Sequence, residues 1–170
     1  MTATIRPCGA RDLPQIFSII NDAAQAYKGI IPADRWHEPY MPLDELKQAI
    51  REGIAFWGCE LRGGEAGSLA GVMGTQDRGD VALIRHAYVR AAERRKGIGE
   101  KLLRELEAMT AKPILIGTWS TAAWAIRFYE KNGYRTLSRS ETGRLLRKYW
   151  SIPERQIETS VVLASARWAS

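Results

Sequence analysis

The sequence predicts a single α+β domain whose sheet is mixed and mostly antiparallel. Three apolar runs, residues 54–62, 68–76 and 81–89, are separated by short glycine-containing turns, which is the pattern of consecutive antiparallel strands. A helix separates the third run from the next strand, 113–118, so these two strands should be parallel and joined by a right-handed crossover. A chain of 170 residues is long enough for one core that buries about 70% of the unfolded surface.

The N-terminal part is predicted to form one short strand and two helices. Residues 2–7 form the strand, and Asp12 with Gln15 offers a capping pair for the first helix. The second helix ends near Gly53 and turns three apolar side chains inward, namely Leu43, Leu46 and Ile50.

The C-terminal part is predicted to contain a helix and the last two strands. The helix spans residues 122–131 and is capped by Ser120 or Thr121. The strands span residues 134–138 and 156–164, and a basic segment that can form a helix separates them.

Charge and composition restrict the classes of partner. The formal net charge of +6 suits a polyanion, which is either a nucleic acid or a polyanionic cofactor. Aromatic residues do not alternate with basic ones on a strand face, as they do in RNA-binding domains, so nucleic acid is the weaker alternative. No apolar run approaches the roughly 20 residues of a membrane span, and the N-terminal residues lack the apolar core of a signal peptide. We therefore expect a cytoplasmic protein with no membrane partner.

The two cysteines, Cys8 and Cys59, are far apart and show no metal-ligand spacing. We expect both to be reduced, buried thiols, and we expect no metal site.

The turn at residues 94–99 is the strongest candidate for a binding site. It follows the buried strand 81–89 and opens a helix with one apolar stripe, formed by Ile98, Leu102, Leu106 and Met109. A helix start leaves backbone N–H groups without internal partners and carries the positive end of the helix dipole. Gly97 and Gly99 let phosphate oxygens approach the backbone, and three consecutive cations precede them. We therefore call residues 94–99 the phosphate turn.

Two common phosphate loops do not fit this turn. A P-loop needs four residues between its glycines and a Ser or Thr after GK, whereas Gly97 and Gly99 are two apart and Glu100 follows. The dinucleotide fingerprint needs a glycine where this chain has Leu102.

The spacing Arg94-x-x-Gly97-x-Gly99 instead resembles the acetyl-CoA pyrophosphate loop of the GCN5-related N-acetyltransferases (GNAT), whose signature is Gln/Arg-x-x-Gly-x-Gly/Ala. A second segment, residues 125–134, resembles the family's Ala-x-x-x-Tyr-Glu-x-x-Gly-Phe/Tyr pattern. The expected order of strands and helices also resembles the family over residues 4–137.

The resemblance implies the GNAT acyl-CoA N-acyltransferase fold over a single N-acetyltransferase domain, residues 1–170. In this fold helices cover both faces of a mixed, mostly antiparallel sheet that is splayed between strands 4 and 5. Those strands correspond here to residues 81–89 and 113–118, and the pantetheine arm of acetyl-CoA would lie in the gap.

The resemblance also implies roles for individual residues. Tyr129 matches the tyrosine that protonates the departing CoA thiolate in many relatives, and either Lys101 or Arg104 could reach the 3′-phosphate. The residues implied beside pantetheine are Ala87, Tyr88 and Val89, and those beside the pyrophosphate are Arg94, Arg95, Lys96, Gly97, Ile98, Gly99 and Glu100.

Two departures from the family pattern concern side chains near the chemistry. Ala122 replaces an asparagine that commonly contacts the cofactor. Leu83 and Gly117 stand where several relatives place a glutamate base. The base is therefore either ordered water or one of His86, His37 and Glu38, and strand alternation favours a structural role for His86.

The acceptor walls implied by the family come from residues 30–41 and 148–155. We expect Trp36 and Tyr40 to line the acceptor cleft and Glu38 to attract the ammonium group. The alternative is that both aromatic side chains fill the core and Glu38 is only solvated.

The sequence thus predicts an acetyl-CoA-dependent N-acetyltransferase that acts on a primary amine of a small molecule or peptide. Direct attack in a ternary complex is favoured, because no cysteine or serine stands near a base in any motif. The alternative is a non-catalytic module that binds or senses acyl-CoA on the same fold. A homodimer is left open.

Overall fold

The computed structural model describes residues 2–169, which divide into two compact units. Both units contain strands and helices, and the strands at residues 55–61, 69–77 and 82–89 follow one another without an intervening helix, which confirms the α+β class. The first unit contains residues 2–26, 37–77 and 84–111, and the second contains residues 27–36, 78–83 and 112–169.

The first unit is built on four neighbouring strands in the order β1-β2-β3-β4. Strand β1 pairs antiparallel with β2, with Ile5 opposite Cys59, and β2 pairs antiparallel with β3, with Gly58 opposite Val72. The strands predicted at residues 54–62, 68–76 and 81–89 are thus confirmed. Their bounds are β1 (Ala3–Pro7), β2 (Ala55–Leu61), β3 (Leu69–Asp77) and β4 (Ala82–Val89), of which residues 84–89 belong to this unit.

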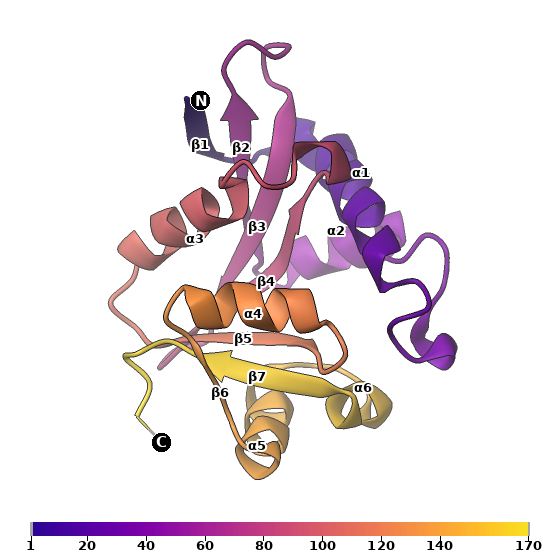
Figure 1. Cartoon of the computed structure of the whole chain (residues 1–170), viewed down its shortest axis with the longest axis vertical. Helices are drawn as coiled ribbons and strands as arrows, with labels where there is room; N and C mark the ends of the chain where they lie inside the picture. Colours follow the sequence, from indigo (N-terminus) through magenta and orange to yellow (C-terminus); the bar gives the residue numbers. More distant parts are fainter. Residues whose placement is uncertain (1, 170) are drawn as a thin grey trace. The chain divides into compact units, whose positions relative to one another are not determined.

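Helices cover both faces of these strands (Figure 1). Helices α1 (Leu13–Ala23) and α2 (Leu43–Arg51) pack on the face that carries Phe56 and Val72, with Ile20 and Leu46 fully buried against it. Helix α3 (Ile98–Ala108) packs on the other face, where Ile98 lies above Gly71. The strands therefore separate the α1/α2 core from the helix that follows the phosphate turn.

The second unit has three strands in the order β5-β7-β6, with Gly117 of β5 opposite Val162 of β7. Helix α5 covers the face that carries Leu115, and α4 lies on the other face (Figure 1). The N–H of Ala82 donates to the carbonyl of Pro113 at 3.0 Å, so β4 and β5 begin side by side. The splay expected between β4 and β5 stays a prediction. The bounds are β5 (Ile114–Trp119), α4 (Ala123–Lys131), β6 (Arg135–Thr136), α5 (Arg139–Tyr149), α6 (Glu154–Glu158) and β7 (Ser160–Ala164).

The predicted helix caps are wrong. A 3-10 turn, η1 (Ala10–Asp12), precedes α1, and Asp12 accepts from the N–H of Gly9 at 2.8 Å instead of capping α1. Gln15 accepts from the N–H of Leu69 at 2.7 Å, so it ties α1 to β3. The N-cap of α4 is Ala122, and no side chain caps that helix.

Two predicted extents and the predicted burial of two side chains also need correction. Pro153 starts the short helix α6, so the last strand begins at Ser160 rather than at residue 156. The strand predicted at residues 134–138 is reduced to Arg135–Thr136. On α2 the side chain of Leu46 is buried, but two others predicted inward, Leu43 and Ile50, are 39% and 38% exposed.

The two cysteines are free; Cys59 is buried as predicted, whereas Cys8 is half-buried. Within residues 2–169 no cluster of three or more His, Cys, Asp or Glu side chains could hold a metal ion. None of the helices in that stretch combines the length and apolar character needed to cross a membrane.

Candidate functional site

Hydrogen bonds anchor the chain where it leaves β4. The N–H of Arg90 donates to the carbonyl of Ala70 on β3 at 2.8 Å, and Arg90 Nε donates to the carbonyl of Leu69 at 3.0 Å. The N–H of Ala91 donates to the carboxylate of Asp22 on α1 at 2.8 Å, at the start of the 3-10 helix η4 (Ala91–Glu93). The approach to the phosphate turn is therefore fixed to both β3 and α1.

The phosphate turn has two residues in the left-handed region, Arg95 with φ 64° and Gly97 with φ 75°. Gly97 is the N-cap of α3 and has no side-chain cap. The first hydrogen bond of this helix runs from the N–H of Lys101 to the carbonyl of Gly97 at 3.1 Å. Among the described residues, no acceptor is found for the N–H groups of residues 97–100. These four donors can therefore bind an anion.

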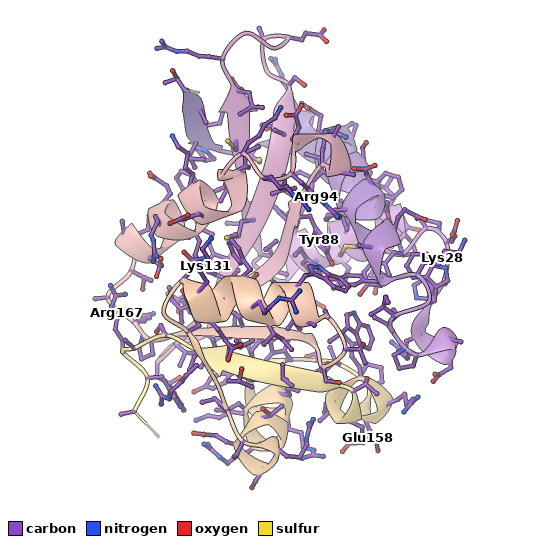
Figure 2. The ribbon with its side chains drawn as sticks, in the orientation of Figure 1. Lys28, Tyr88, Arg94, Lys131, Glu158 and Arg167 are labelled. Carbon is purple, nitrogen blue, oxygen red and sulfur yellow. The ribbon has the colours of Figure 1, made fainter. Side chains whose placement is uncertain are left out.

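The cations of the phosphate turn differ in their partners. Lys96 pairs with Glu93 at 2.5 Å, whereas Arg94 and Arg95 are exposed and make no ion pair within residues 2–169. Figure 2 marks Arg94 in this turn. The two arginines thus add positive charge beside the unpaired N–H groups, which strengthens anion binding.

A groove of about 670 Å³ continues from the phosphate turn between α3 and β1. Lys96, Lys101 and Arg104 line it. Arg104 is paired with Glu107 at 2.8 Å, whereas Lys101 has no ion-pair partner in the described part of the chain. Of the two cations predicted for a 3′-phosphate, Lys101 is thus the more available.

Gly71 of β3 lets α3 and the end of β4 approach the strand closely. A Cβ at this position would lie 2.9 Å from Ile98 Cγ2 and 3.2 Å from the carbonyl oxygen of Tyr88. We expect Gly71→Ala to lower the free energy of unfolding by roughly 1–3 kcal/mol, the usual cost of overpacking. Urea unfolding measures this change. Gly64→Ala is the control, because its Cβ would meet only one atom, at 3.4 Å; equal stability of the two variants would contradict the close approach.

The residues predicted beside pantetheine, Ala87, Tyr88 and Val89, are half-buried at the end of β4. Tyr88, marked in Figure 2, packs against the α1/α2 core. His86 before them has φ 57°, so the regular alternation of β4 is broken there. Gly74 of β3 accommodates this irregularity, because a Cβ on it would lie 2.7 Å from the carbonyl oxygen of Arg85.

His86 is half-buried and its ring stacks on Phe56, with centroids 6.2 Å apart. Burial and the neighbouring charge of Arg85 lower the pKa of His86 to about 3. The imidazole is therefore neutral at pH 7 and is a weak base. The stacking on Phe56 supports a structural role for His86, although the regular strand alternation from which that role was predicted is broken at this residue.

The lowered pKa of His86 predicts a pH dependence of stability. The unfolded chain binds a proton near pH 6.5 and the folded chain only near pH 3, so protonation favours unfolding in that window. We expect stability to fall as the pH drops from 6.5 towards 3, and to fall less steeply in His86→Asn, because asparagine binds no proton in this range. Asparagine is chosen because it tolerates the positive φ at this position. Urea unfolding at several pH values measures both slopes, and parallel slopes would contradict the lowered pKa.

Tyr129 lies on α4 and is 6% exposed. Its ring makes edge contacts with Phe128 and Tyr134, at centroid distances of 5.1 and 5.9 Å. Burial, with smaller contributions from Tyr27 and Tyr134, raises the pKa of Tyr129, so its hydroxyl stays protonated. It can therefore act as a proton donor.

The predicted acceptor residues do not fall in one unit. Glu38 is exposed and Tyr40 is half-buried against the α1/α2 core, both in the first unit. Trp36 is half-buried in the second unit, after the 3-10 helix η3 (Ala33–Arg35). Asp34 of η3 pairs with Arg155 of α6 at 3.0 Å, a link that no local pattern could reveal. The joint role of these residues stays a prediction.

A family model described as an acetyltransferase (GNAT) domain matches residues 52–136. No curated protein matches. Among solved structures, a GNAT-family acetyltransferase from Staphylococcus aureus Mu50 superimposes with a TM-score of 0.70 at 16% identity, covering 96% of this chain and 98% of its own.

Two further solved structures are similar over almost their whole length. The PaiA N-acetyltransferase from Thermoplasma acidophilum, in complex with coenzyme A, has a TM-score of 0.70 at 18% identity, covering 97% of this chain and 99% of its own. The ribosomal-protein-S18-alanine N-acetyltransferase from Escherichia coli has a TM-score of 0.62 at 20% identity, with coverages of 99% and 96%. At these identities the similarity shows the fold, and the predicted fold is confirmed.

Proposed function

This chain belongs to the GNAT acetyltransferase family, and from that premise we propose that it is an acetyl-CoA-dependent N-acetyltransferase. Its acceptor would be the primary amine of a small molecule or peptide. The observation that carries the proposal is the set of N–H groups at residues 97–100 that have no acceptor among the described residues, beside Arg94 and Arg95, which make no ion pair within residues 2–169. A diphosphate needs this combination of backbone donors and positive charge.

We propose that acetyl-CoA binds along the end of β4 and the phosphate turn. Its pyrophosphate would accept from the N–H groups of Gly97, Ile98, Gly99 and Glu100, with Arg94, Arg95 and Lys96 nearby. Its pantetheine amides would pair with the backbone of residues 87–89. Lys101, which has no ion-pair partner among the described residues, is the cation that we assign to the 3′-phosphate.

The proposed reaction is direct attack of the neutral amine on the thioester carbon. The N–C bond forms, the C–S bond breaks, and the amine proton leaves to a base. His86 is too weakly basic at pH 7 for this task, so ordered water is favoured over it. The carbonyl oxygen would accept from the N–H of Val89, and the thiolate would receive its proton from Tyr129.

A non-catalytic acyl-CoA-binding module remains a second candidate function. It is favoured by the weak basicity of His86 and by the apolar or absent side chains at Leu83 and Gly117. A panel of primary amines, with free-thiol release from acetyl-CoA as the readout, distinguishes the two. Saturable binding of acetyl-CoA with no amine-dependent thiol release supports the module, and amine-dependent release supports the enzyme.

Glu38 provides the test of the acceptor wall. We propose that its carboxylate attracts the acceptor ammonium, so Glu38→Ala should raise the acceptor KM about two- to fivefold, the usual value of one exposed ion pair. Because Glu38 is exposed, the melting temperature should not change. Steady-state kinetics measures the change.

Glu65→Ala is the matched control, because Glu65 is an exposed carboxylate in the turn between β2 and β3. An equal KM in the two variants would remove Glu38 from the acceptor site.

Trp36→Ala and Tyr40→Ala test the two aromatic residues of the predicted acceptor wall. A raised KM at wild-type stability supports the cleft role, whereas loss of stability with unchanged kinetics supports core packing.

A further inference from the structure

A cavity of about 510 Å³ lies in the first unit, on the face of β2 that α1 and α2 cover. Its wall comes from η1, the start of α1, one side of α2 and the beginning of β2. Helix α3 and the phosphate turn lie on the opposite face of the strands, so the cavity is distinct from the proposed acetyl-CoA site.

Most of the cavity wall is apolar, and its main side chains are Leu13, Ile16, Ile50 and Phe56. The predicted inward position of Ile50 is wrong with respect to the core, because the side chain is 38% exposed and borders this cavity. A volume of this size is typical of small-molecule sites, which bury an apolar body against such a wall.

Two cations, Lys47 and Arg51, border the cavity four residues apart on α2. Lys47 makes no ion pair within residues 2–169, and Arg51 donates only to the neutral side chain of Gln48, at 2.7 and 3.1 Å. Cys8, also in the wall, is uncharged because burial raises its pKa to about 11. The wall contains no carboxylate among the described residues, so its charge is wholly positive.

We propose that this cavity binds a small amphipathic carboxylate, a straight-chain acid of about eight to ten carbons. Its chain would lie against Leu13, Ile50 and Phe56, and its carboxylate would pair with Lys47 and Arg51. An apolar ligand without charge would leave both cations unpaired, and a hydrophilic anion would leave the apolar wall exposed to water. The amphipathic acid satisfies both parts of the cavity.

Calorimetry with hexanoate, octanoate and decanoate, each below its micelle-forming concentration, tests this site. We expect one-site binding that strengthens by about fourfold for each methylene group added. Decanol should bind at least tenfold more weakly than decanoate. Absence of saturable binding, or equal affinity for decanol, would overturn the proposal.

Variants locate the site. Lys47→Glu with Arg51→Glu should weaken decanoate binding at least tenfold, whereas melting temperature and acetyl-CoA affinity should stay at wild-type values. Arg127→Glu with Lys131→Glu is the control for net charge, because these two exposed cations on α4 are also four residues apart and the charge changes by the same amount. Equal weakening in the control would mean that decanoate is attracted by net charge and not by this cavity.

Saturating acetyl-CoA should not displace decanoate, and displacement would mean that the acid occupies the acetyl-CoA site instead.

Cys8 gives a local readout that does not depend on enzymatic activity. It is half-buried in the cavity wall, whereas the other thiol, Cys59, is buried elsewhere. Decanoate should slow maleimide labelling of Cys8 at pH 8.5, as measured by peptide mass spectrometry. Unchanged labelling of Cys8 at saturating decanoate would place the ligand outside this cavity.

Discussion

Tyr129→Phe is expected to lower the acetyl-transfer turnover by about 10- to 10⁴-fold, the range for loss of one general acid. The departing CoA thiolate needs a proton or a hydrogen bond, and the Tyr129 hydroxyl, whose pKa is raised by burial, is a weaker acid than a free phenol but carries a proton that it can donate. Phenylalanine keeps the ring contacts with Phe128 and Tyr134, so stability and acetyl-CoA affinity should change little. Single-turnover kinetics and calorimetry measure the two quantities separately.

Tyr134→Phe is the control for this experiment, because Tyr134 belongs to the same aromatic cluster and is also buried. It should keep wild-type turnover. If Tyr129→Phe also keeps it, water protonates the thiolate, and Tyr129 is a packing residue. If both variants lose turnover together with stability, the cluster as a whole positions α4, and the specific role of Tyr129 is wrong.

Local patterns in the sequence were sufficient for the parts of the fold that depend on neighbouring residues. The strands β2, β3 and β4 follow from apolar runs and glycine turns, and the phosphate turn follows from the spacing of Arg94, Gly97 and Gly99. The predicted helix caps are wrong because the side chains expected to cap the helices form hydrogen bonds with other groups. Asp12 accepts from Arg6 of β1 and from the N–H of Gly9, and Gln15 accepts from the N–H of Leu69 on β3, a contact between distant residues that no local rule can anticipate.

Features made by distant residues could not be predicted. Gly71 matters because Ile98 lies 2.9 Å from its missing Cβ, and the two are far apart in sequence. The ion pair between Asp34 and Arg155 joins residues 121 positions apart. The cavity wall combines four segments, so only their packing places Lys47 and Arg51 beside an apolar surface. The chemistry of the candidate site stays a prediction from the sequence, whereas the packing around that site could be described only from the structure.

Gly97→Val is expected to weaken acetyl-CoA binding by at least tenfold. Gly97 has φ 75°, which a β-branched residue reaches only at a cost of about 1–2 kcal/mol. Within residues 2–169, the adjoining residues aside, no atom lies within 4 Å of the position of its Cβ, so there is room for a side chain. Gly97 is also the first of the residues at the start of α3 whose N–H groups find no acceptor among the described residues, where the pyrophosphate is proposed to bind. Calorimetry with acetyl-CoA measures the loss.

Gly63→Val separates backbone strain from loss of the phosphate contact. Gly63 has φ 88° in the turn between β2 and β3, and no atom lies within 4 Å of its Cβ position either. The two valine variants should therefore lose similar stability, but only Gly97→Val should lose affinity for acetyl-CoA. A folded Gly97→Val protein with wild-type affinity would end the assignment of the phosphate turn. Equal loss of affinity in both variants would attribute the effect to strain, because Gly63 contributes nothing to the proposed pyrophosphate site.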